Sequence, residues 1–543
     1  MKILVVGGVA GGAGVCARLR RNSEQFQIIM FEKGEYISFA NCGLPYYIGD
    51  VITDKCALQI QTPQGFGKRF NVDVRTFSEV VELDTTLKRV KVYNHQTQVE
   101  YWESYDKLIL SPGAKPITPK FAGADLAHVF TLRNIPDTYK IKEFTDKQKT
   151  GTAVVIGGGY IGIEMAENLQ HLGYQVQIVE ANTHLIASID LEVAAHLQNY
   201  LRERGLKLFL KSRVTEITPE FVCLENGEKI AADLVIMSIG VQADTGFLKN
   251  SGVALNALGQ IIVDANLRTN VQDVYALGDA VEHLCFTGAK RNIPLASPAN
   301  RQARLLADII CGSKQQYPGS QGTAILKAFD LVVAVTGESE ESLQQNKINY
   351  LKSYTYSANH ARYYPGASTM FIKLLYTPTG VVLGAQIVGG TGVDKRIDVL
   401  ASAVRHQLTV QELTELELAY APPFNSAKDP VNMAGYVAEN VLLGKSKFFY
   451  PEDLARVQTT DILLDVRSKS EYQQGHLSAA INIPLDDLRG RIAELEPNKK
   501  IFIYCAVGLR GYIAQRILQQ NGFIETYNLS GGYELYSVLA SNK

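Results

Sequence analysis

Thr152-Ala153-Val154-Val155-Ile156 runs directly into Gly157-Gly158-Gly159-Tyr160-Ile161-Gly162, and this stretch decides the fold. The apolar residues predict a buried strand, and the turn that follows fits the GxGxxG pattern in full. Residues 163–172 then have the pattern of a helix, and residues 175–179 predict a second strand that ends at Glu180. Such a unit places a pyrophosphate on a helix N-terminus and a ribose hydroxyl on a carboxylate. It predicts a dinucleotide-binding domain.

The acid that ends this unit indicates which nicotinamide cofactor binds. A carboxylate suits the free ribose 2′-hydroxyl of NADH, and the following residues 181–183 offer no arginine for a 2′-phosphate. We therefore predict NADH rather than NADPH. The candidate binding residues are Gly157, Gly159, Gly162 and Glu180.

A second copy of the same pattern opens the chain. Residues 2–6 predict a strand, residues 13–21 a helix, and residues 28–31 the next strand. Val9 replaces the middle glycine of GxGxxG, so this copy alone could be a tight strand-to-helix turn. Two units in one chain are more specific than one, and together they suggest FAD and NADH sites. The candidate FAD residues of this copy are Gly7, Gly8, Gly11, Gly12 and Glu32.

Composition limits the class of protein. A chain of 543 residues, 46% hydrophobic and 20% charged, predicts a globular protein of three or four domains. The net charge of −1 gives no footprint for nucleic acid or an anionic membrane surface. No apolar stretch is long enough to span a bilayer. The 7 cysteines lack metal-type CxxC spacing, so we expect a reducing cytoplasm and no metal.

Several segments carry a resemblance to a known family. Tyr105–Ala114 is similar to the strand and turn that return from a flavin domain, and Asn270–Ala280 is similar to the segment whose aspartate holds the FAD ribityl chain. With Cys42 in an SFxxC setting, residues 1–445 resemble the single-cysteine pyridine nucleotide-disulfide oxidoreductases, specifically coenzyme A-disulfide reductase. The resemblance implies FAD on the first nucleotide fold, with Ser111, Gly113 and Asp279, and NADH on the second.

Cys42 suggests the mechanism. The next cysteine is Cys56, so we predict no internal dithiol, and Cys42 would exchange sulfur bonds directly with a substrate. Residues 43–45 can begin a helix whose amide dipoles would favour the reactive thiolate. The alternative is a small buried hydrophobic residue.

The resemblance also implies a coenzyme A site and a homodimer. Tyrosines from residues 359–366 and 418–424 would reach the partner's cysteine, and we favour Tyr420, then Tyr363, as donors to a leaving thiolate. Arginine suits the phosphates of coenzyme A, although any one arginine could be a solvated helix face. The implied coenzyme A contacts are Arg18, Arg21, Ser38, Asn41, Asn300 and Arg304.

The C-terminal 90 or so residues resemble the rhodanese domain. The matching segments are residues 462–467, 471–477 and 481–485. Residues 501–504 predict a strand that delivers Cys505 to a loop ending at Arg510. Backbone amides curled around a sulfur stabilise a thiolate or persulfide, and we expect Arg510 to close the ring. The four intervening residues favour sulfane sulfur over the phosphate of related phosphatases, whose loop has five by that resemblance. The alternative is a silent docking domain.

These observations predict an α/β protein with two Rossmann-like domains, an α+β dimerisation domain and an α/β rhodanese domain. We expect FAD binding in residues 1–115 and 260–325, NADH binding in 150–259, dimerisation in 326–445 and rhodanese in 451–543. The predicted enzyme reduces coenzyme A persulfide, polysulfide or disulfide through Cys42, while Cys505 supplies or transfers sulfane sulfur from a donor. An NADH oxidase or peroxidase, or chiefly a sulfurtransferase, stays an alternative.

Overall fold

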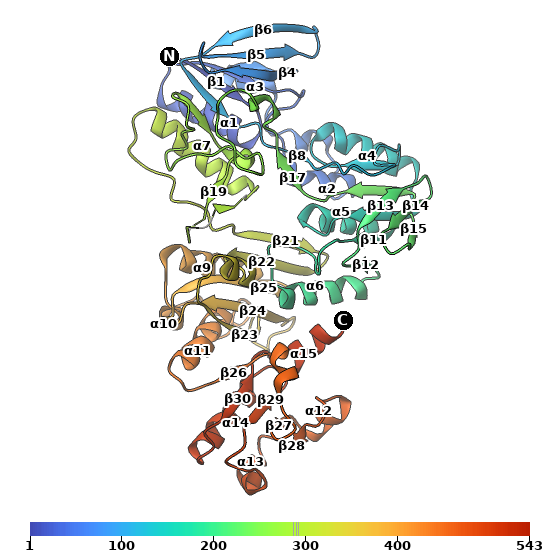
Figure 1. Ribbon diagram of the computed structural model, residues 1–543, viewed down its shortest axis with the longest axis vertical. Helices are drawn as coiled ribbons and strands as arrows, with labels where there is room; N and C mark the ends of the chain where they lie inside the picture. Colours follow the sequence, from blue (N-terminus) through green and yellow to red (C-terminus); the bar gives the residue numbers. More distant parts are fainter. Residues whose placement is uncertain (286, 289, 292, 543) are drawn as a thin grey trace. The chain divides into compact units, whose positions relative to one another are not determined.

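The computed structural model describes residues 1–285, 287–288, 290–291 and 293–542, and they fall into two compact units. The first contains residues 1–183 and 206–322, and the second contains residues 184–205 and everything from residue 323 onward. Figure 1 shows the elements of both units in chain order. Among the described residues, no helix combines the length and apolar character needed to cross a membrane.

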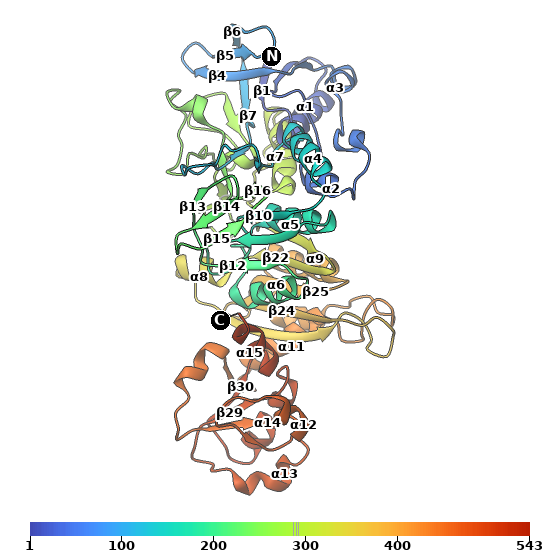
Figure 2. The ribbon, with the colours of Figure 1, turned by 90° about the vertical axis from the view of Figure 1, so that its right-hand side faces the viewer.

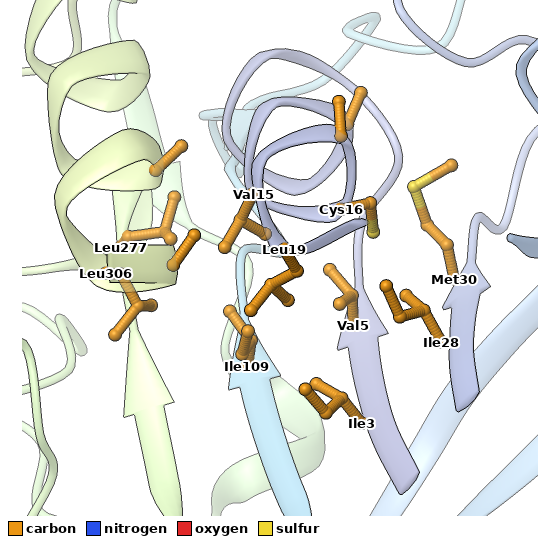
Figure 3. Packing of buried hydrophobic residues seen from close by; sticks show 14 of the residues in the cluster. Ile3, Val5, Val15, Cys16, Leu19, Ile28, Met30, Ile109, Leu277 and Leu306 are labelled. Atoms are coloured by element: carbon orange, nitrogen blue, oxygen red, sulfur yellow. The ribbon is translucent and has the colours of Figure 1, made fainter. Parts of the chain in front are cut away.

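The N-terminal sheet of the first unit has five parallel strands in the order β18-β7-β1-β2-β3. Helices α1 and α7 pack side by side, and Figure 3 shows Val15 and Leu19 of α1 directed toward the strand residues Val5 and Ile109. Parallel strands buried on both faces are apolar throughout, as these sequences predict. Its elements are β1 (Lys2–Val6), α1 (Ala10–Asn22), β2 (Gln27–Phe31), η1 (Asn41–Gly43), α2 (Leu44–Ile48), η2 (Lys55–Leu58), α3 (Pro63–Phe70), β3 (Asp73–Arg75), β7 (Lys107–Leu110), β18 (Val274–Ala276), η4 (Gly278–Ala280) and α7 (Ala296–Ile310).

A second parallel sheet in the same unit has the order β12-β11-β10-β16-β9. The strand and helix predicted around GxGxxG are β10 (Thr152–Ile156) and α5 (Tyr160–His171), and the next strand is β11 (Gln175–Val179). The remaining elements of the unit are β4 (Ser78–Asp84), β5 (Arg89–Asn94), β6 (Val99–Ser104), β8 (Ala114–Pro116), β9 (Val129–Thr131), α4 (Ile135–Lys147), β12 (Lys207–Phe209), β13 (Val214–Ile217), β14 (Phe221–Leu224), β15 (Lys229–Ala231), β16 (Leu234–Met237), β17 (Val241–Ala243), η3 (Gly246–Leu248), β19 (His283–Leu284) and β20 (Lys290–Arg291).

The second unit begins with α6 (Leu191–Glu203), which packs with β22 and β25 of a five-stranded antiparallel sheet. The strand order is β21-β22-β25-β24-β23, and α9 and α11 contribute to the apolar core on the sheet. These elements are β21 (Ala324–Ala328), β22 (Leu331–Gly337), α8 (Glu340–Gln345), β23 (Leu351–Ala358), β24 (Thr369–Tyr376), β25 (Val382–Gly389), α9 (Val393–His406), α10 (Val410–Glu415) and α11 (Pro430–Leu442).

A buried ionic cluster joins α6 to this sheet. The Nζ atom of Lys373 in β24 is fully buried and lies 2.9 Å from Asp190 and 2.8 Å from Glu192, and it also contacts Glu340. Burial alone would lower the pKa of Lys373, but the surrounding carboxylates raise it above its usual range. Burial would likewise raise the pKa of Glu192, but the attraction of Lys373 and Lys352 lowers it to about 2. Lys373 and Glu192 are therefore both ionised at neutral pH.

The C-terminal part of the second unit is a parallel sheet in the order β26-β30-β29-β27-β28. Figure 2 shows α14 beside β29 and β30, against which it packs. The elements are β26 (Phe448–Phe449), η5 (Pro451–Arg456), β27 (Ile462–Asp465), α12 (Lys469–Gln474), β28 (Ile481–Asn482), α13 (Leu488–Arg491), η6 (Ile492–Glu494), β29 (Ile501–Tyr504), α14 (Leu509–Gln520), β30 (Thr526–Leu529) and α15 (Gly532–Ala540).

Candidate active sites

Cys42 lies in the short turn η1, immediately before α2, and is exposed. The segment is held by backbone bonds, because Ala40 N donates to Leu58 O at 2.9 Å and Gly43 N donates to Ala40 O at 2.9 Å. Ser38 adopts a left-handed backbone conformation at φ 43°. The predicted helix start after Cys42 is confirmed at Leu44. The thiol is thus presented on a fixed turn.

The expectation that amide dipoles would lower the pKa of Cys42 is wrong for the protein chain by itself. The thiol is reachable from solvent, yet the surrounding atoms desolvate it and raise its pKa, and the charges of Glu164 and Asp279 raise it further. The helix that follows spans only residues 44–48 and contributes little dipole. A positive charge or a hydrogen bond from a bound group would favour the thiolate.

The residues Tyr46 and Glu164 beside Cys42 were not singled out from the sequence. Helices α2 and α5 pack so closely that a Cβ on Gly49 would lie 2.0 Å from the side-chain oxygen of Asn168. Tyr46 hydrogen-bonds to Glu164, and burial raises the pKa of Glu164 to about 7. The sequence signal that could have identified Glu164 is a carboxylate between the apolar residues Ile163 and Met165, directly after the glycine turn. Both of these neighbours are buried.

We expect Glu164→Gln to lower the pKa of Cys42. Glu164 is neutral below about pH 7 and becomes an anion above it, and that anion opposes formation of the thiolate. The substitution keeps the shape of the side chain and removes the charge. The rate of alkylation by iodoacetamide against pH, measured without nicotinamide nucleotide, should rise at lower pH than in the parent protein. An unshifted profile would contradict the electrostatic coupling.

The N-terminal glycine turn fits the pyrophosphate and ribose of FAD. Gly7 has φ 97°, and a Cβ there would lie 2.0 Å from the carbonyl oxygen of Ser111. Gly8 N donates to Glu32 Oε2 at 2.9 Å, which holds the predicted ribose carboxylate at the turn. Asp279, the residue predicted to hold the ribityl chain of FAD, is paired with Arg133, and the Arg133 Nη2 atom lies 3.5 Å from Asp279 Oδ2. When bound, FAD would supply two-electron transfer between NADH and sulfur, and these residues would hold it.

The second glycine turn has the same construction. Gly158 N donates to Glu180 Oε2 at 2.7 Å, and Asn182 N donates to Glu180 Oε1 at 2.7 Å. A Cβ on Gly162 would lie 2.0 Å from the carbonyl oxygen of Gly157, so the helix approaches the strand closely. A Cβ on Gly159 would meet nothing within 4 Å, which leaves the helix N-terminus open to a phosphate. The turn fits NADH.

Four of the predicted coenzyme A contacts, Arg18, Arg21, Asn300 and Arg304, lie on the packed helices α1 and α7. Arg18 donates to both oxygens of Asp308, at 2.8 and 3.1 Å, so an acid already occupies its guanidinium fork. Arg304 is exposed on α7 and its charge acts on the same carboxylate. The Asn300 amide donates to Ala296 O at 2.9 Å. Arg21 is exposed at the end of α1, and the remaining two candidates, Ser38 and Asn41, precede Cys42 in the chain.

The two candidate tyrosines form a pair. The hydroxyls of Tyr363 and Tyr420 lie 2.9 Å apart, and the side chains are 75% and 49% exposed. Buried Arg396 contacts both segments, because its Nη2 atom donates to Asn359 O at 2.8 Å and to Phe424 O at 3.5 Å. The sequence left a choice between the tyrosines, whereas the fold presents their hydroxyls together.

Cys505 follows β29 and is 1% exposed. Gly508 N donates to its Sγ atom at 3.1 Å, and α14 begins at the next residue, so the sulfur lies at the N-terminus of this helix. The loop is held from behind, because Tyr533 N donates to Cys505 O at 2.8 Å and Glu534 N donates to Ala506 O at 2.9 Å. An amide donor at a helix N-terminus suits an anionic sulfur, such as the terminal sulfur of a persulfide.

The prediction that Arg510 closes the ring around this sulfur needs correction. Its NH1 and NH2 atoms donate to the two oxygens of Glu471, at 2.8 and 2.6 Å, so its hydrogen bonds go to a carboxylate, although its charge still acts on Cys505. Glu471 lies in a segment that resembles the rhodanese domain, and its pairing with Arg510 is a tertiary contact from α12 to α14.

The fold and these sites agree with the comparison against known families. Residues 1–303 match the pyridine nucleotide-disulphide oxidoreductase family, residues 323–430 match its dimerisation domain, and residues 451–538 match the rhodanese-like domain. The chain belongs to the pyridine nucleotide-disulphide oxidoreductase family and carries a C-terminal rhodanese-like domain. FAD and NAD(H) are the cofactors of this class, as predicted.

Three individual proteins are similar to this chain over most of its length. Coenzyme A disulfide reductase of Staphylococcus aureus (strain bovine RF122 / ET3-1) is 36% identical over 441 residues, which cover 81% of this chain and 100% of the relative. The structure of reduced Bacillus anthracis CoADR-RHD is 46% identical with a TM-score of 0.97, covering 99% of this chain and 98% of that one. A NAD-dependent persulfide reductase from A. fulgidus is 34% identical with a TM-score of 0.92, covering 99% and 100%.

Proposed function

We propose that this chain is an FAD- and NADH-dependent reductase of coenzyme A persulfide, polysulfide or disulfide, with a rhodanese domain that supplies or transfers sulfane sulfur. The observation that supports it best is the presence of two separate sulfur sites in one chain. Cys42 lies on a fixed turn among the flavin-domain elements, and Cys505 lies in an amide-lined loop. The likeness to both a CoADR-RHD structure and a persulfide reductase structure over nearly the whole chain agrees with this reading.

The reaction at Cys42 balances as a two-electron reduction. The Cys42 thiolate attacks the coenzyme A sulfur of the persulfide, forms a mixed disulfide and releases hydrosulfide. An electron pair from NADH then breaks the mixed disulfide, which returns the Cys42 thiolate and releases coenzyme A thiolate. With coenzyme A disulfide, the first leaving group is coenzyme A thiolate instead. We also propose that Arg18, Arg304 and Asn300 contact coenzyme A, together with the other residues that the resemblance implies.

The pair formed by Tyr363 and Tyr420 leads to a further prediction about the reaction at Cys42. We expect Tyr420→Phe to slow reduction about 10- to 100-fold because a hydroxyl that donates to the leaving thiolate is lost. Tyr363→Phe should have a smaller effect, and the double variant should be little worse than Tyr420→Phe because the two hydroxyls act as one pair at 2.9 Å. Steady-state rates with coenzyme A persulfide measure this. Full additivity of the two effects would contradict a shared role.

We propose the division of the chain into FAD, NADH, dimerisation and rhodanese domains with the ranges predicted above, and a homodimer formed through the region that matches the dimerisation family. A reducing compartment such as the cytoplasm agrees with the spacing of the cysteines, which are scattered along the chain and form no CxxC pair.

The deciding experiment is anaerobic NADH oxidation with coenzyme A persulfide, with the sulfide released measured directly. Coenzyme A disulfide and hydrogen peroxide are run in parallel. Rapid sulfide production with slow disulfide and peroxide turnover supports a persulfide reductase. Fast disulfide turnover with little sulfide identifies a coenzyme A disulfide reductase with an accessory domain. Turnover of peroxide alone overturns the proposal.

A further inference from the structure

The loop around Cys505 has one charged side chain, Arg510, and the fold neutralises it. Glu471 accepts two hydrogen bonds from the guanidinium of Arg510, at 2.8 and 2.6 Å. The carboxylate is itself fixed, because Ser468 N donates to its Oε2 atom at 2.9 Å in a capping box at the start of α12. The bond to Arg510 is the main cause that lowers the pKa of Glu471 to about 2, so the acid stays ionised at all ordinary pH values.

The rest of the loop adds no compensating charge. The residues between Cys505 and Arg510 are Ala506, Val507, Gly508 and Leu509. Leu509 is 59% exposed and Ile513, one turn further along α14, is 38% exposed, which gives this helix an apolar surface next to the loop. The backbone amide of Gly508 donates to the sulfur.

The neighbouring Arg467 is committed elsewhere. Its NH2 atom lies 2.7 Å from Asp465 and donates to Gly475 O at 2.6 Å. Its guanidinium also lies 4.1 Å from the ring centroid of Tyr533. Arg467 is buried among these partners, so its charge is balanced by Asp465.

We propose that Glu471 determines which sulfur donor this domain uses. Because Glu471 neutralises Arg510, it disfavours binding of the thiosulfate dianion, and Cys505 accepts sulfur from persulfides of organic thiols instead. A thiosulfate ion brings two negative charges to an anionic sulfur and needs a cation to offset the repulsion. A thiol persulfide carries one charge at most and has an organic group that can lie on apolar surface. The inference rests on the proposed sulfurtransferase role of Cys505, and Glu471 acts through Arg510.

The transfer is balanced without any oxidant or reductant. The Cys505 thiolate attacks the outer sulfur of the donor RSSH, the sulfur–sulfur bond of the donor breaks, and RSH leaves with the donor's proton. Cys505 then carries the sulfane sulfur as a persulfide. A thiol acceptor such as coenzyme A attacks that outer sulfur in turn, which forms coenzyme A persulfide and restores the Cys505 thiolate.

The test compares two donors on the full-length holoenzyme without NADH. Glutathione persulfide and thiosulfate are supplied separately, cyanide is the acceptor, and thiocyanate is measured. We expect the parent protein to use glutathione persulfide at least about tenfold better in kcat/KM than thiosulfate, and Glu471→Gln to raise kcat/KM for thiosulfate at least about tenfold, because one opposing charge next to Arg510 is removed. The gain should shrink as salt is added.

A matched control separates specificity from a general structural effect. Glu494 also binds an arginine in this domain with two hydrogen bonds, both 2.7 Å, to Arg491. Glu494→Gln removes the same kind of ion pair and should leave the donor ratio unchanged. Cys505→Ser should abolish thiocyanate formation from both donors.

Three results would overturn the inference. They are equal use of both donors by the parent protein, an unchanged donor ratio in Glu471→Gln, and an equal change in Glu494→Gln. A variant that fails to fold is recognised by a changed circular dichroism spectrum and a lower denaturant midpoint, and Glu471→Ala then repeats the measurement. Because the assay needs neither NADH nor Cys42, failure of the proposed reductase function would leave this result readable.

Discussion

Cys42→Ser should reduce NADH-driven turnover of coenzyme A persulfide and coenzyme A disulfide by at least about 10³-fold, because the hydroxyl is a far weaker nucleophile at the same position. No cysteine close in sequence could take over the role of Cys42, because the next cysteine is Cys56. Bound flavin should remain, because Cys42 is exposed on a turn and not part of either glycine turn. Stopped-flow and steady-state NADH absorbance measure the loss.

Two control variants make this result specific. Cys223→Ser alters a thiol in β14, which is part of neither glycine turn and neither sulfur loop, and should keep parental turnover. Cys505→Ser should keep direct reduction of coenzyme A disulfide while it loses transfer from a sulfane-sulfur donor. If Cys42→Ser kept its turnover while Cys505→Ser lost it, the protein would be chiefly a sulfurtransferase.

The largest stability effect is expected from Lys373→Met. The substitution removes the only cation that contacts Asp190, Glu192 and Glu340 together among the described residues, and leaves three carboxylates crowded in a buried site. Breaking a buried ion cluster by removing one partner costs about 3–5 kcal/mol. We expect a lower denaturant midpoint for the second unit, which contains all four residues. Urea titration followed by circular dichroism measures it.

The pH dependence of this variant has a definite sign. In the parent protein the pKa of Glu192 is lowered to about 2, so its contribution to stability is present above the usual glutamate range and is lost as the pH falls toward 2. Without Lys373 the carboxylates gain protons more readily, and protonation relieves their repulsion. The difference in midpoint between parent and variant should therefore shrink as the pH falls from 7 to 4.

A surface lysine provides the comparison. Lys147 pairs with Glu143 within α4, and both side chains are largely exposed. Lys147→Met should leave the midpoint almost unchanged, because exposed ion pairs contribute little. A similar loss in both variants would show that burial of the Lys373 cluster is not the cause.

The local patterns of the chain were enough to predict the nucleotide folds. The strand predicted at residues 152–156 is β10 with the same limits, and the acid predicted to end the next strand accepts hydrogen bonds from the turn amides. These features depend on residues close in sequence, since a glycine turn, a strand and a helix each have a local period. The position of α6 does not follow from such local patterns. This helix follows β11 in the chain, yet it packs in the second unit. Its fully buried partner Lys373 lies 182 residues after Leu191, a separation no local pattern spans.

The sequence by itself determined the two dinucleotide turns, the single flavin-domain cysteine and the C-terminal sulfur loop, because residue type and short spacing dictate each of them. Only the tertiary structure decided what surrounds them. It placed Glu164 beside Cys42 and raised the pKa of that thiol, paired the hydroxyls of Tyr363 and Tyr420, and gave Arg510 to Glu471. The physical reason is that hydrogen bonds and charges act over a few ångströms in space, and packing of distant segments sets which groups come that close.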